Sequence, residues 1–312
     1  MRFQEVARLN DLLKIYPGWN DLYRRCSSAT PFQSPDWLIP LLSNLAHGLL
    51  SVIAVWAGEE LVAILPLAQE DGVLSFIGAG ITDYQDVLIA ERYVDQTLES
   101  FSTYLREHRY ELNEVRYNSP LLRLSGDWSV CNTSPVLLLP TTIIEYDRGL
   151  SAHFRESLDH SWNRLEKRGD IQIESSSSVD VIECLDDLIK LHRARWHLKA
   201  LPGVLASPEI QAFHRESVVK LVATQHARLY RLTVGGDVAA VLYLLLDKRA
   251  AYYYLGGFSP EYSGFSPGSL LIRHAIRESI RSGQQEFHFL RGGEAYKYRW
   301  GAKDRYLYRL KM

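Results

Sequence analysis

The sequence predicts an α/β (α+β) fold of two tandem domains, each a mixed, mainly antiparallel sheet flanked by helices. Length is the first reason, because 312 residues, at roughly 150 per domain, suffice for two hydrophobic cores. The second reason is internal, since the same order of strand-like and helix-like segments occurs twice. Both copies begin with a turn of glycine and acidic residues, followed by small and branched apolar residues.

In the first copy, the turn at Gly58 starts an apolar run, and a polar turn at 69–72 leads into a further run at 73–77. Turn residues in these places predict an antiparallel meander of three strands. A stretch with apolar residues at helical spacing, 92–108, comes next, followed by a strand-like run at 114–117. The predicted order is β-β-β-α-β.

The second copy has corresponding apolar runs at 234–242 and 250–255, and the later run ends on paired glycines. Residues 269–281 carry one apolar stripe at helical spacing, and 286–290 alternate like a strand. These segments predict a second β-β-β-α-β unit.

Two further helices, 154–168 and 180–199, are predicted between the copies. Proline and glycine residues between 135 and 149 mark the linker. We therefore expect an N-terminal domain of residues 1–148 and a C-terminal domain of residues 149–312.

Composition and charge limit the classes of function. Apolar residues make up 46% and charged residues 23%, which excludes an intrinsically disordered chain. Lysine and arginine (35) nearly balance aspartate and glutamate (37), so no broad nucleic-acid surface is expected. Residues 1–150 carry 11 basic and 19 acidic side chains, and the remainder carries 24 and 18. This asymmetry favours the C-terminal half for anion binding, although chance drift in surface charge explains it equally well.

The sequence lacks the motifs of several other classes of protein. The longest apolar stretches, 49–57 and 238–246, are shorter than the ~20 residues of a membrane span, and no signal sequence opens the chain. Three scattered cysteines give neither a disulfide framework nor a metal spacing. No HExxH pair, G-x-S-x-G elbow or phosphate loop ending in Gly-Lys-Ser/Thr is present. We expect a soluble cytoplasmic protein that binds no metal and is neither a hydrolase nor an NTPase.

The start of the late helix carries the most informative chemistry. Ser266 suits an N-cap and Pro267 suits the first helical position. The amides of Gly268, Ser269 and Leu270 would then have no partner inside the helix, and Gly268 lets a ligand approach the backbone. Free amides at the positive end of the helix dipole suit a pyrophosphate. The same residues also suit an ordinary, well-capped helix.

Several segments share their residues with one known family. In chain order they are Pro31-Phe32-Gln33-Ser34-Pro35-Asp36-Trp37, Asp83-Tyr84, Leu191-His192-Arg193-Ala194-Arg195-Trp196, Tyr252-Tyr253-Tyr254-Leu255-Gly256-Gly257-Phe258-Ser259-Pro260-Glu261, Ser266-Pro267-Gly268-Ser269-Leu270-Leu271 and Phe289-Leu290-Arg291-Gly292-Gly293-Glu294-Ala295-Tyr296-Lys297-Tyr298-Arg299-Trp300-Gly301. On these segments the chain resembles the GNAT superfamily, and specifically the CelD/BcsL-like (cellulose-biosynthesis-type) acetyltransferases. It departs from the family at Tyr262 and Ser263, where the usual phosphate loop has Arg or Gln, and at His288, where relatives often have Asp.

The resemblance implies tandem GNAT-like domains, also found in FemAB-type transferases, and transfer of an acyl group from a thioester to an amine. Acetyl-CoA or another acyl-CoA is the implied co-substrate, held between the third strand and the late helix of the second copy. The implied cofactor-binding residues are Leu255, Gly256, Gly257, Phe258, Gly264, Ser266, Gly268, Ser269 and Leu270.

N-acylation needs a deprotonated amine, a polarised carbonyl and a proton for the departing thiolate. Glu294 is the candidate base, provided that burial raises its pKa towards neutrality. Lys297 could hold an anionic substrate or the oxyanion, and Tyr296 could return a proton to sulfur. A solvated loop face explains the charges of this segment about as well.

The acceptor pocket is expected to use residues from both copies, namely Asp83, Tyr84, His192, Arg195, Trp196, Tyr254 and Trp300. For His192 and Trp196, the alternative is a place in the hydrophobic core. The first copy lacks a Ser-Pro-Gly helix start, so we expect it to bind no CoA and to form one wall of the acceptor site.

Three functions remain open on the sequence. The first is an acyl-CoA-dependent N-acyltransferase acting on an amine of a small molecule or sugar-type acceptor. The second is a FemAB-like transferase that takes its donor from an aminoacyl-tRNA. The third is a non-catalytic GNAT-like binding module in polysaccharide biosynthesis. The sequence does not indicate an oligomeric state.

Overall fold

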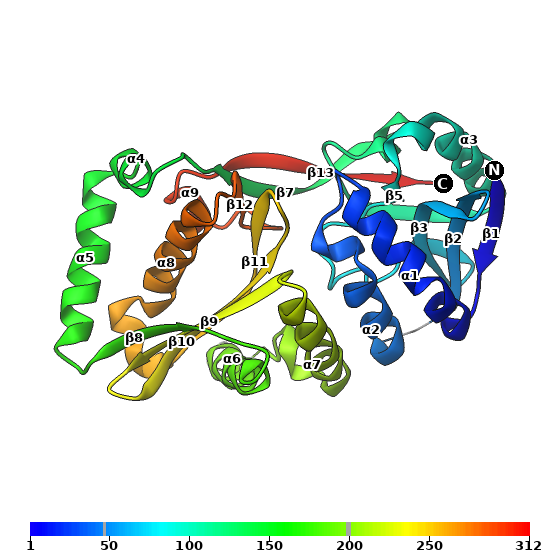
Figure 1. Cartoon of the computed structure of the whole chain (residues 1–312). Coiled ribbons are helices and arrows are strands. Elements are labelled where there is room, and N and C mark those ends of the chain that lie inside the picture. Colours follow the sequence, from blue (N-terminus) through cyan, green and yellow to red (C-terminus); the bar gives the residue numbers. More distant parts are fainter. Residues whose placement is uncertain (46–47, 198–200) are drawn as a thin grey trace. The chain divides into compact units, whose positions relative to one another are not determined.

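The computed structural model describes residues 1–45, 48–197 and 201–312, and the chain forms two compact units (Figure 1). The N-terminal unit comprises Met1–Ser134 and Arg305–Met312, and the C-terminal unit comprises Pro135–Asp304. These limits differ from the predicted ranges 1–148 and 149–312. Each sheet is completed by a strand that the sequence analysis assigned to the other domain or to the linker.

The N-terminal unit is built on one sheet, with strands in the order β1-β2-β3-β4-β6-β13 and with β5 beside β3. Its strands are β1 (Arg2–Val6), β2 (Leu49–Ala57), β3 (Glu60–Glu70), β4 (Val73–Phe76), β5 (Leu88–Ile89), β6 (Arg109–Arg116) and β13 (Lys303–Lys311). Its helices are α1 (Leu9–Arg25), α2 (Pro35–Leu45) and α3 (Val94–Arg106), with short 3-10 turns at Pro31–Gln33, Glu91–Tyr93 and Pro120–Arg123. Helix α1 packs on β3 and α3 packs on β6.

The sheet of the C-terminal unit has the order β7-β12-β11-β10-β9-β8. Its strands are β7 (Ser129–Leu138), β8 (Ile171–Ser175), β9 (Ala227–Val234), β10 (Asp237–Leu246), β11 (Ala250–Phe258) and β12 (Glu286–His288). Its helices are α4 (Ile143–Gly149), α5 (Ala152–Glu166), α6 (Val181–His197), α7 (Pro208–Ala223), α8 (Pro267–Arg281) and α9 (Ala295–Tyr298), with 3-10 turns at Val204–Ala206 and Pro260–Phe265. Helices α6 and α8 both pack on β10 and β11, and Figure 1 shows them on opposite faces of these strands.

The predicted duplication is confirmed. Strands β2, β3 and β4 form an antiparallel meander, as do β9, β10 and β11. In each unit a helix then leads to a strand that runs parallel to the third strand of the meander. The helix predicted at 180–199 is α6 as far as His197, and its last two residues lie outside the described part of the chain. Across the described residues, none of the helices combines the length and apolar character of a membrane span.

The two copies differ where the parallel strands separate. In the C-terminal unit, β11 pairs with β12 only from Ala250 to Tyr252 and then continues to Phe258 without it, which leaves a wedge. In the N-terminal unit, β4 and β5 pair with successive stretches of β3, and the chain between them leaves the strand. This excursion, residues 77–87, returns to the edge of β6, where Gln85 pairs with Val115 and donates its N–H to the Glu114 carbonyl. The first copy therefore fills its own wedge.

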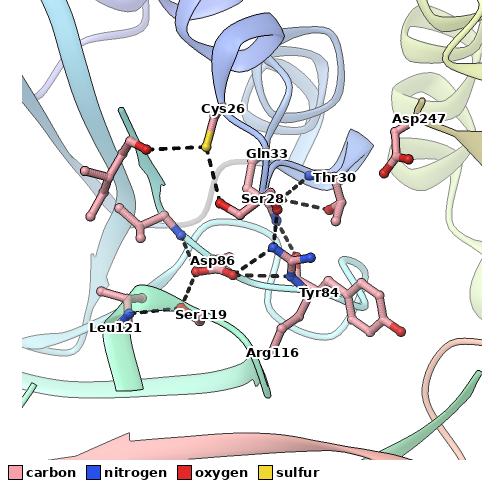
Figure 2. Close-up of polar contacts among 12 residues, drawn as sticks. Cys26, Ser28, Thr30, Gln33, Tyr84, Asp86, Arg116, Ser119, Leu121 and Asp247 are labelled. Atoms are coloured by element: carbon pink, nitrogen blue, oxygen red, sulfur yellow. Dashed lines mark hydrogen bonds and ion pairs between the residues drawn. The ribbon is translucent and has the colours of Figure 1, made fainter. Parts of the chain in front are cut away.

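A buried polar network anchors the excursion (Figure 2). The Asp86 carboxylate, 1% exposed, accepts hydrogen bonds from the Arg116 guanidinium at 3.2 Å, the Ser119 hydroxyl at 2.5 Å and the Val87 amide at 2.8 Å. Arg116 also donates to the Ser28 carbonyl. Because two buried charges satisfy each other here, this network fixes the excursion on β6.

Candidate active site

The wedge beside β11 opens into a cavity of about 160 Å³, which we call the wedge cavity. It lies between β10, β11, the start of α8 and the end of α6. Its walls are Arg195, Val241, Leu242, Tyr253, Gly256, Gly257, Phe258, Gly268, Ser269, Leu271, Ile272 and Tyr296. The structure thus brings together seven of the predicted site residues, namely Arg195, Gly256, Gly257, Phe258, Gly268, Ser269 and Tyr296.

The two glycines of β11 serve close packing on both faces of the strand. A Cβ on Gly256 would clash with the Tyr253 hydroxyl, so the missing side chain gives the Tyr253 ring its place in the wedge cavity. A Cβ on Gly257 would lie 2.9 Å from the Leu191 Cβ and 3.0 Å from the His192 amide nitrogen. Gly257 therefore lets α6 approach the strand.

A β-bulge in β11 determines which tyrosine enters the wedge cavity. The register with β10 pairs Tyr243 with Leu255 and Leu244 with Tyr253, so Tyr254 is the extra residue. Tyr253 lines the wedge cavity. Tyr254, the predicted acceptor residue, does not line it and packs against the rings of His214 and Tyr243.

The start of α8 differs in part from the prediction. Ser266 occupies the N-cap position, but its backbone is left-handed (φ 52°) and its side chain makes no capping hydrogen bond. Its carbonyl accepts the amides of Ser269 at 2.9 Å and Leu270 at 3.2 Å. Of the three amides expected to be free, only that of Gly268 has no partner among the described residues, and Gly268 lines the wedge cavity. The expected row of three donors is therefore wrong.

Arg195 supplies positive charge to the wedge cavity. Its guanidinium carbon lies 5.2 Å from the centroid of the Phe258 ring, and a Cβ on Gly268 would lie 3.5 Å from the same ring. Phe258 thus separates a cation on α6 from the free amide of α8. Arg195 was expected in the acceptor pocket, whereas here it faces the helix start proposed to bind phosphate.

Lys297 does not point a free ammonium at a substrate. Its side chain is 3% exposed, and Nζ donates to the carbonyls of Leu290 at 3.2 Å, Arg291 at 2.6 Å and Gly292 at 3.0 Å. These carbonyls belong to a turn in which Leu290 has φ 59° and Gly292 has φ 98°. Nζ also lies 2.9 Å from Glu294 Oε2, so four acceptors surround an ammonium that has three protons, and the expected oxyanion role is not supported.

The condition placed on Glu294 is not met. Partial burial acts to raise the pKa of the Glu294 carboxyl, but the hydrogen bond and charge of Lys297, with Nζ 2.9 Å from Oε2, outweigh it. The pKa therefore lies below its ordinary value, and the Glu294 side chain is 59% exposed. A carboxylate stabilised in this way is a weaker base than the reaction needs at neutral pH.

We predict that Glu294→Gln changes turnover less than about threefold and leaves the shape of the pH profile between pH 6 and 9 unchanged. A carboxyl group with a lowered pKa keeps the same charge across that range. The measurement is thiol release from acetyl-CoA with an amino sugar as acceptor. A profile that loses its acidic limb in the variant would restore Glu294 as the base.

Tyr296 remains the candidate acid. Tyr296 is 40% exposed overall, but desolvation of its phenol by the wall of the wedge cavity is the main cause that raises the pKa, with a smaller contribution from Tyr253. The phenol is thus protonated at neutral pH, but its raised pKa makes it a weaker proton donor than an ordinary tyrosine, and its role as acid stays a prediction.

The other predicted residues lie elsewhere. Trp300 is 2% exposed and packs edge-on against Phe154, with ring centroids 4.8 Å apart, so it belongs to the core. Leu270 is also buried in that core, Gly264 is exposed, and Leu255 does not line the wedge cavity.

In the N-terminal unit, Tyr84 is 2% exposed, and its hydroxyl lies 2.5 Å from that of Ser134. Asp83 precedes Tyr84 in the excursion. These burials do not support substrate contacts by Trp300, Leu270 or Tyr84.

His192 and Trp196 pack against each other and against Gly203, which fits the alternative of a structural role. Their rings lie 5.8 Å apart, and a Cβ on Gly203 would lie 2.7 Å from both. Burial, together with the charge of Arg195, lowers the pKa of His192 to about 4. Burial also lowers the pKa of His214, on α7, to about 3.

These two histidines predict acid sensitivity of the C-terminal unit. Each has a folded pKa below its ordinary value of 6.5. Below pH 6.5 the unfolded chain therefore binds more protons than the folded chain. The free energy of unfolding should fall as pH drops from 6.5 to about 4, by up to about 1.4 kcal/mol per pH unit for each histidine. Urea unfolding at several pH values checks this. His214→Leu should flatten the slope, and equal slopes in variant and parent would contradict the assignment.

The C-terminal unit is similar in sequence to a known family. Residues 152–298 match the family model described as an acetyltransferase (GNAT) domain. The matched residues lie within the C-terminal unit, and the match supports a transferase. No curated protein matches the chain significantly in sequence.

Solved structures agree over nearly the whole chain. FemX is similar with a TM-score of 0.68 at 11% identity, over 100% of this chain and 98% of that one. The C-terminal domain (DUF2156) of a putative lysylphosphatidylglycerol synthetase from Agrobacterium fabrum gives 0.64 at 12% identity, over 96% and 91%. A tandem GNAT protein from the clavulanic acid biosynthesis pathway gives 0.51 at 13% identity, over 99% and 98%. At such identities the likeness is one of fold, and it confirms the predicted fold class.

Proposed function

We propose that this chain is an acyl-CoA-dependent N-acyltransferase, with acetyl-CoA as the default donor and an amine of a small molecule or sugar-type compound as acceptor. The observation that carries the proposal is the wedge cavity, where the unpaired amide of Gly268, the hydroxyl-bearing Ser269 and the guanidinium of Arg195 line one space. An amide at a helix start and a guanidinium are donors that suit phosphate oxygens.

Different residues of the wedge cavity would have different roles in the transfer. A bound thioester supplies an activated acyl group. Gly268, Ser269 and Arg195 would hold the phosphates of its carrier, and the part of β11 past Tyr252, which extends beyond its pairing with β12, would face the carbonyl. Tyr296 would donate a proton to the leaving sulfur. The N-terminal copy, whose excursion pairs with β6, would bind no CoA.

The test is calorimetric titration with CoA, acetyl-CoA and desulfo-CoA. Arg195→Gln should weaken CoA binding about tenfold or more, because one charge-assisted hydrogen bond contributes roughly 1.5–3 kcal/mol. Arg193→Gln, on the same helix but exposed, is the matched control and should bind as the parent does. No heat and no thermal stabilisation at millimolar CoA would overturn the proposal.

The second candidate is the FemAB-like transferase with an aminoacyl-tRNA donor. It is favoured by the fold likeness to FemX and to the lysylphosphatidylglycerol synthetase domain. Absence of CoA binding combined with saturable binding of a charged tRNA would select it. Absence of both would leave the non-catalytic module of polysaccharide biosynthesis. The resemblance to the CelD/BcsL-like family, and with it an amino-sugar or sugar-nucleotide acceptor, is proposed on the sequence motifs alone.

A further inference from the structure

A second cavity of the C-terminal unit, of about 320 Å³, lies on another side of α8. We call it the arginine cavity. It opens between α5, β8 and α8, and its walls are Asp159, Trp162, Ile173, Leu270, Arg273, His274, Arg277 and Arg281. The two cavities share no lining residue, because α8 presents positions 268, 269, 271 and 272 to the wedge and 270, 273, 274, 277 and 281 to the arginine cavity.

The walls of the arginine cavity are strongly basic. Arg273, Arg277 and Arg281 are four residues apart, a spacing that places them on one face of the helix. Asp159 is the single carboxylate in the lining, and it pairs with Arg273 at 2.6 Å. Arg277 pairs with Asp147 at 2.6 Å, and Arg281 pairs with Glu278. Each of these pairs uses one terminal nitrogen of the guanidinium, so every arginine keeps other donors.

Four buried polar atoms around these arginines have no hydrogen-bond partner among the described residues. They are Arg273 Nε, Arg277 Nε, Asp147 Oδ1 and the hydroxyl of Tyr146. Tyr146 is 4% exposed and lies within electrostatic reach of both arginines. Arg273 Nε and Arg277 Nε are donors of residues that line the arginine cavity, and a partner rich in oxygen atoms would satisfy them. Asp147 Oδ1 is an acceptor, and neither Asp147 nor Tyr146 lines the cavity, so these two atoms do not bear on that partner.

The remaining walls limit what that partner can be. Ile173 and Leu270 are apolar, and the Trp162 ring is held by a hydrogen bond of 2.6 Å from its Nε1 to Glu166. An occupant therefore needs an anionic head towards the arginines and a less polar body against Trp162. Phosphate is the anion whose geometry a guanidinium matches in a bidentate manner.

We propose that the arginine cavity is a second ligand site, which binds a small organic phosphate monoester independently of the wedge cavity. The monoester places its phosphate between Arg277 and Arg281 and its body against Trp162. The site does not depend on the transfer chemistry proposed above.

The test uses inorganic phosphate as probe, titrated into the full-length protein at constant ionic strength with chloride as the balancing ion. Saturable stabilisation in thermal unfolding and saturable heat in calorimetry are expected. Arg281→Gln and Arg277→Gln should each weaken phosphate binding about tenfold or more. The Arg281 side chain is 57% exposed where it pairs with Glu278, so its substitution is expected to leave the fold intact even if loss of the Arg277–Asp147 pair does not.

Two controls make the result decisive. Arg249→Gln, at an exposed turn, should bind phosphate as the parent does. Arg195→Gln should also retain phosphate binding, because Arg195 lines only the wedge cavity. Absence of saturation, or a response that survives in Arg277→Gln and Arg281→Gln but disappears in Arg195→Gln, would overturn the proposal. Failure of CoA binding with phosphate binding intact would overturn the proposed function alone.

Discussion

A Lys297→Met variant is expected to melt roughly 6–12 °C below the parent protein. The substitution leaves the carbonyls of Leu290, Arg291 and Gly292 without their shared donor in a turn with two left-handed residues. Together these losses should cost about 3 kcal/mol, and each kcal/mol lowers the melting temperature by about 2–4 °C in a domain of this size. Differential scanning calorimetry measures the effect.

Lys248→Met is the matched control, because Lys248 lies in the exposed turn between β10 and β11. It should melt within about 1–2 °C of the parent. If Lys297→Met melted at the parent temperature but lost turnover, Lys297 would act on the substrate and not on the turn.

Arg116→Met is expected to destabilise the N-terminal unit by about 3–5 kcal/mol. The substitution leaves the carboxylate of Asp86, 1% exposed, without its positive partner, and an uncompensated buried charge is costly. Chemical unfolding, followed by the fluorescence of the N-terminal tryptophans, measures the loss. Arg123→Met removes an exposed pair with Asp95 and should cost less than about 1 kcal/mol.

A double variant separates the charge from the packing. Adding Asp86→Asn to Arg116→Met removes the buried charge, and the neutral amide can still contact Ser119 and the Val87 amide. The double variant should therefore be more stable than Arg116→Met alone. Equal stability would show that the loss comes from the Arg116 side chain's other contacts, including the Ser28 carbonyl.

Local patterns predicted the repeated part of the fold well. Each meander is closed by short turns, and each following helix carries one apolar stripe, so neighbouring residues contain the necessary information. The sequence analysis predicted neither β7 nor the place of β13 in the N-terminal sheet, because the partners lie far along the chain: β7 pairs with β12, and β13 pairs with β6. Helix α7 was also missed, although Ser207 and Pro208 mark its start and the Ser207 hydroxyl accepts the Ile210 amide.

The wedge cavity was partly predictable for the same reason. Gly268 was selected because a missing side chain lets a ligand approach the backbone, and it lines the wedge cavity. Gly256 and Gly257, which the resemblance implied, also line it, and their missing side chains make room for Tyr253 and α6. Tyr253 was missed in favour of Tyr254, since a bulge cannot be read from the alternation of residues. The dense group of ionisable side chains near Lys297 suggested catalysis. In the structure, the Lys297 ammonium instead binds the carbonyls of a turn that contains two left-handed residues.

The excursion in the N-terminal unit has a thermodynamic consequence. A peptide that occupies a binding groove of its own chain is present at a fixed effective concentration, which no dilution lowers. A diffusible competitor for the edge of β6 could bind there only after Gln85 had left β6 and the Asp86–Arg116 pair had broken. In the first copy a segment of the same chain is therefore bound at the edge of β6, whereas in the second copy β11 continues past Tyr252 without pairing to β12.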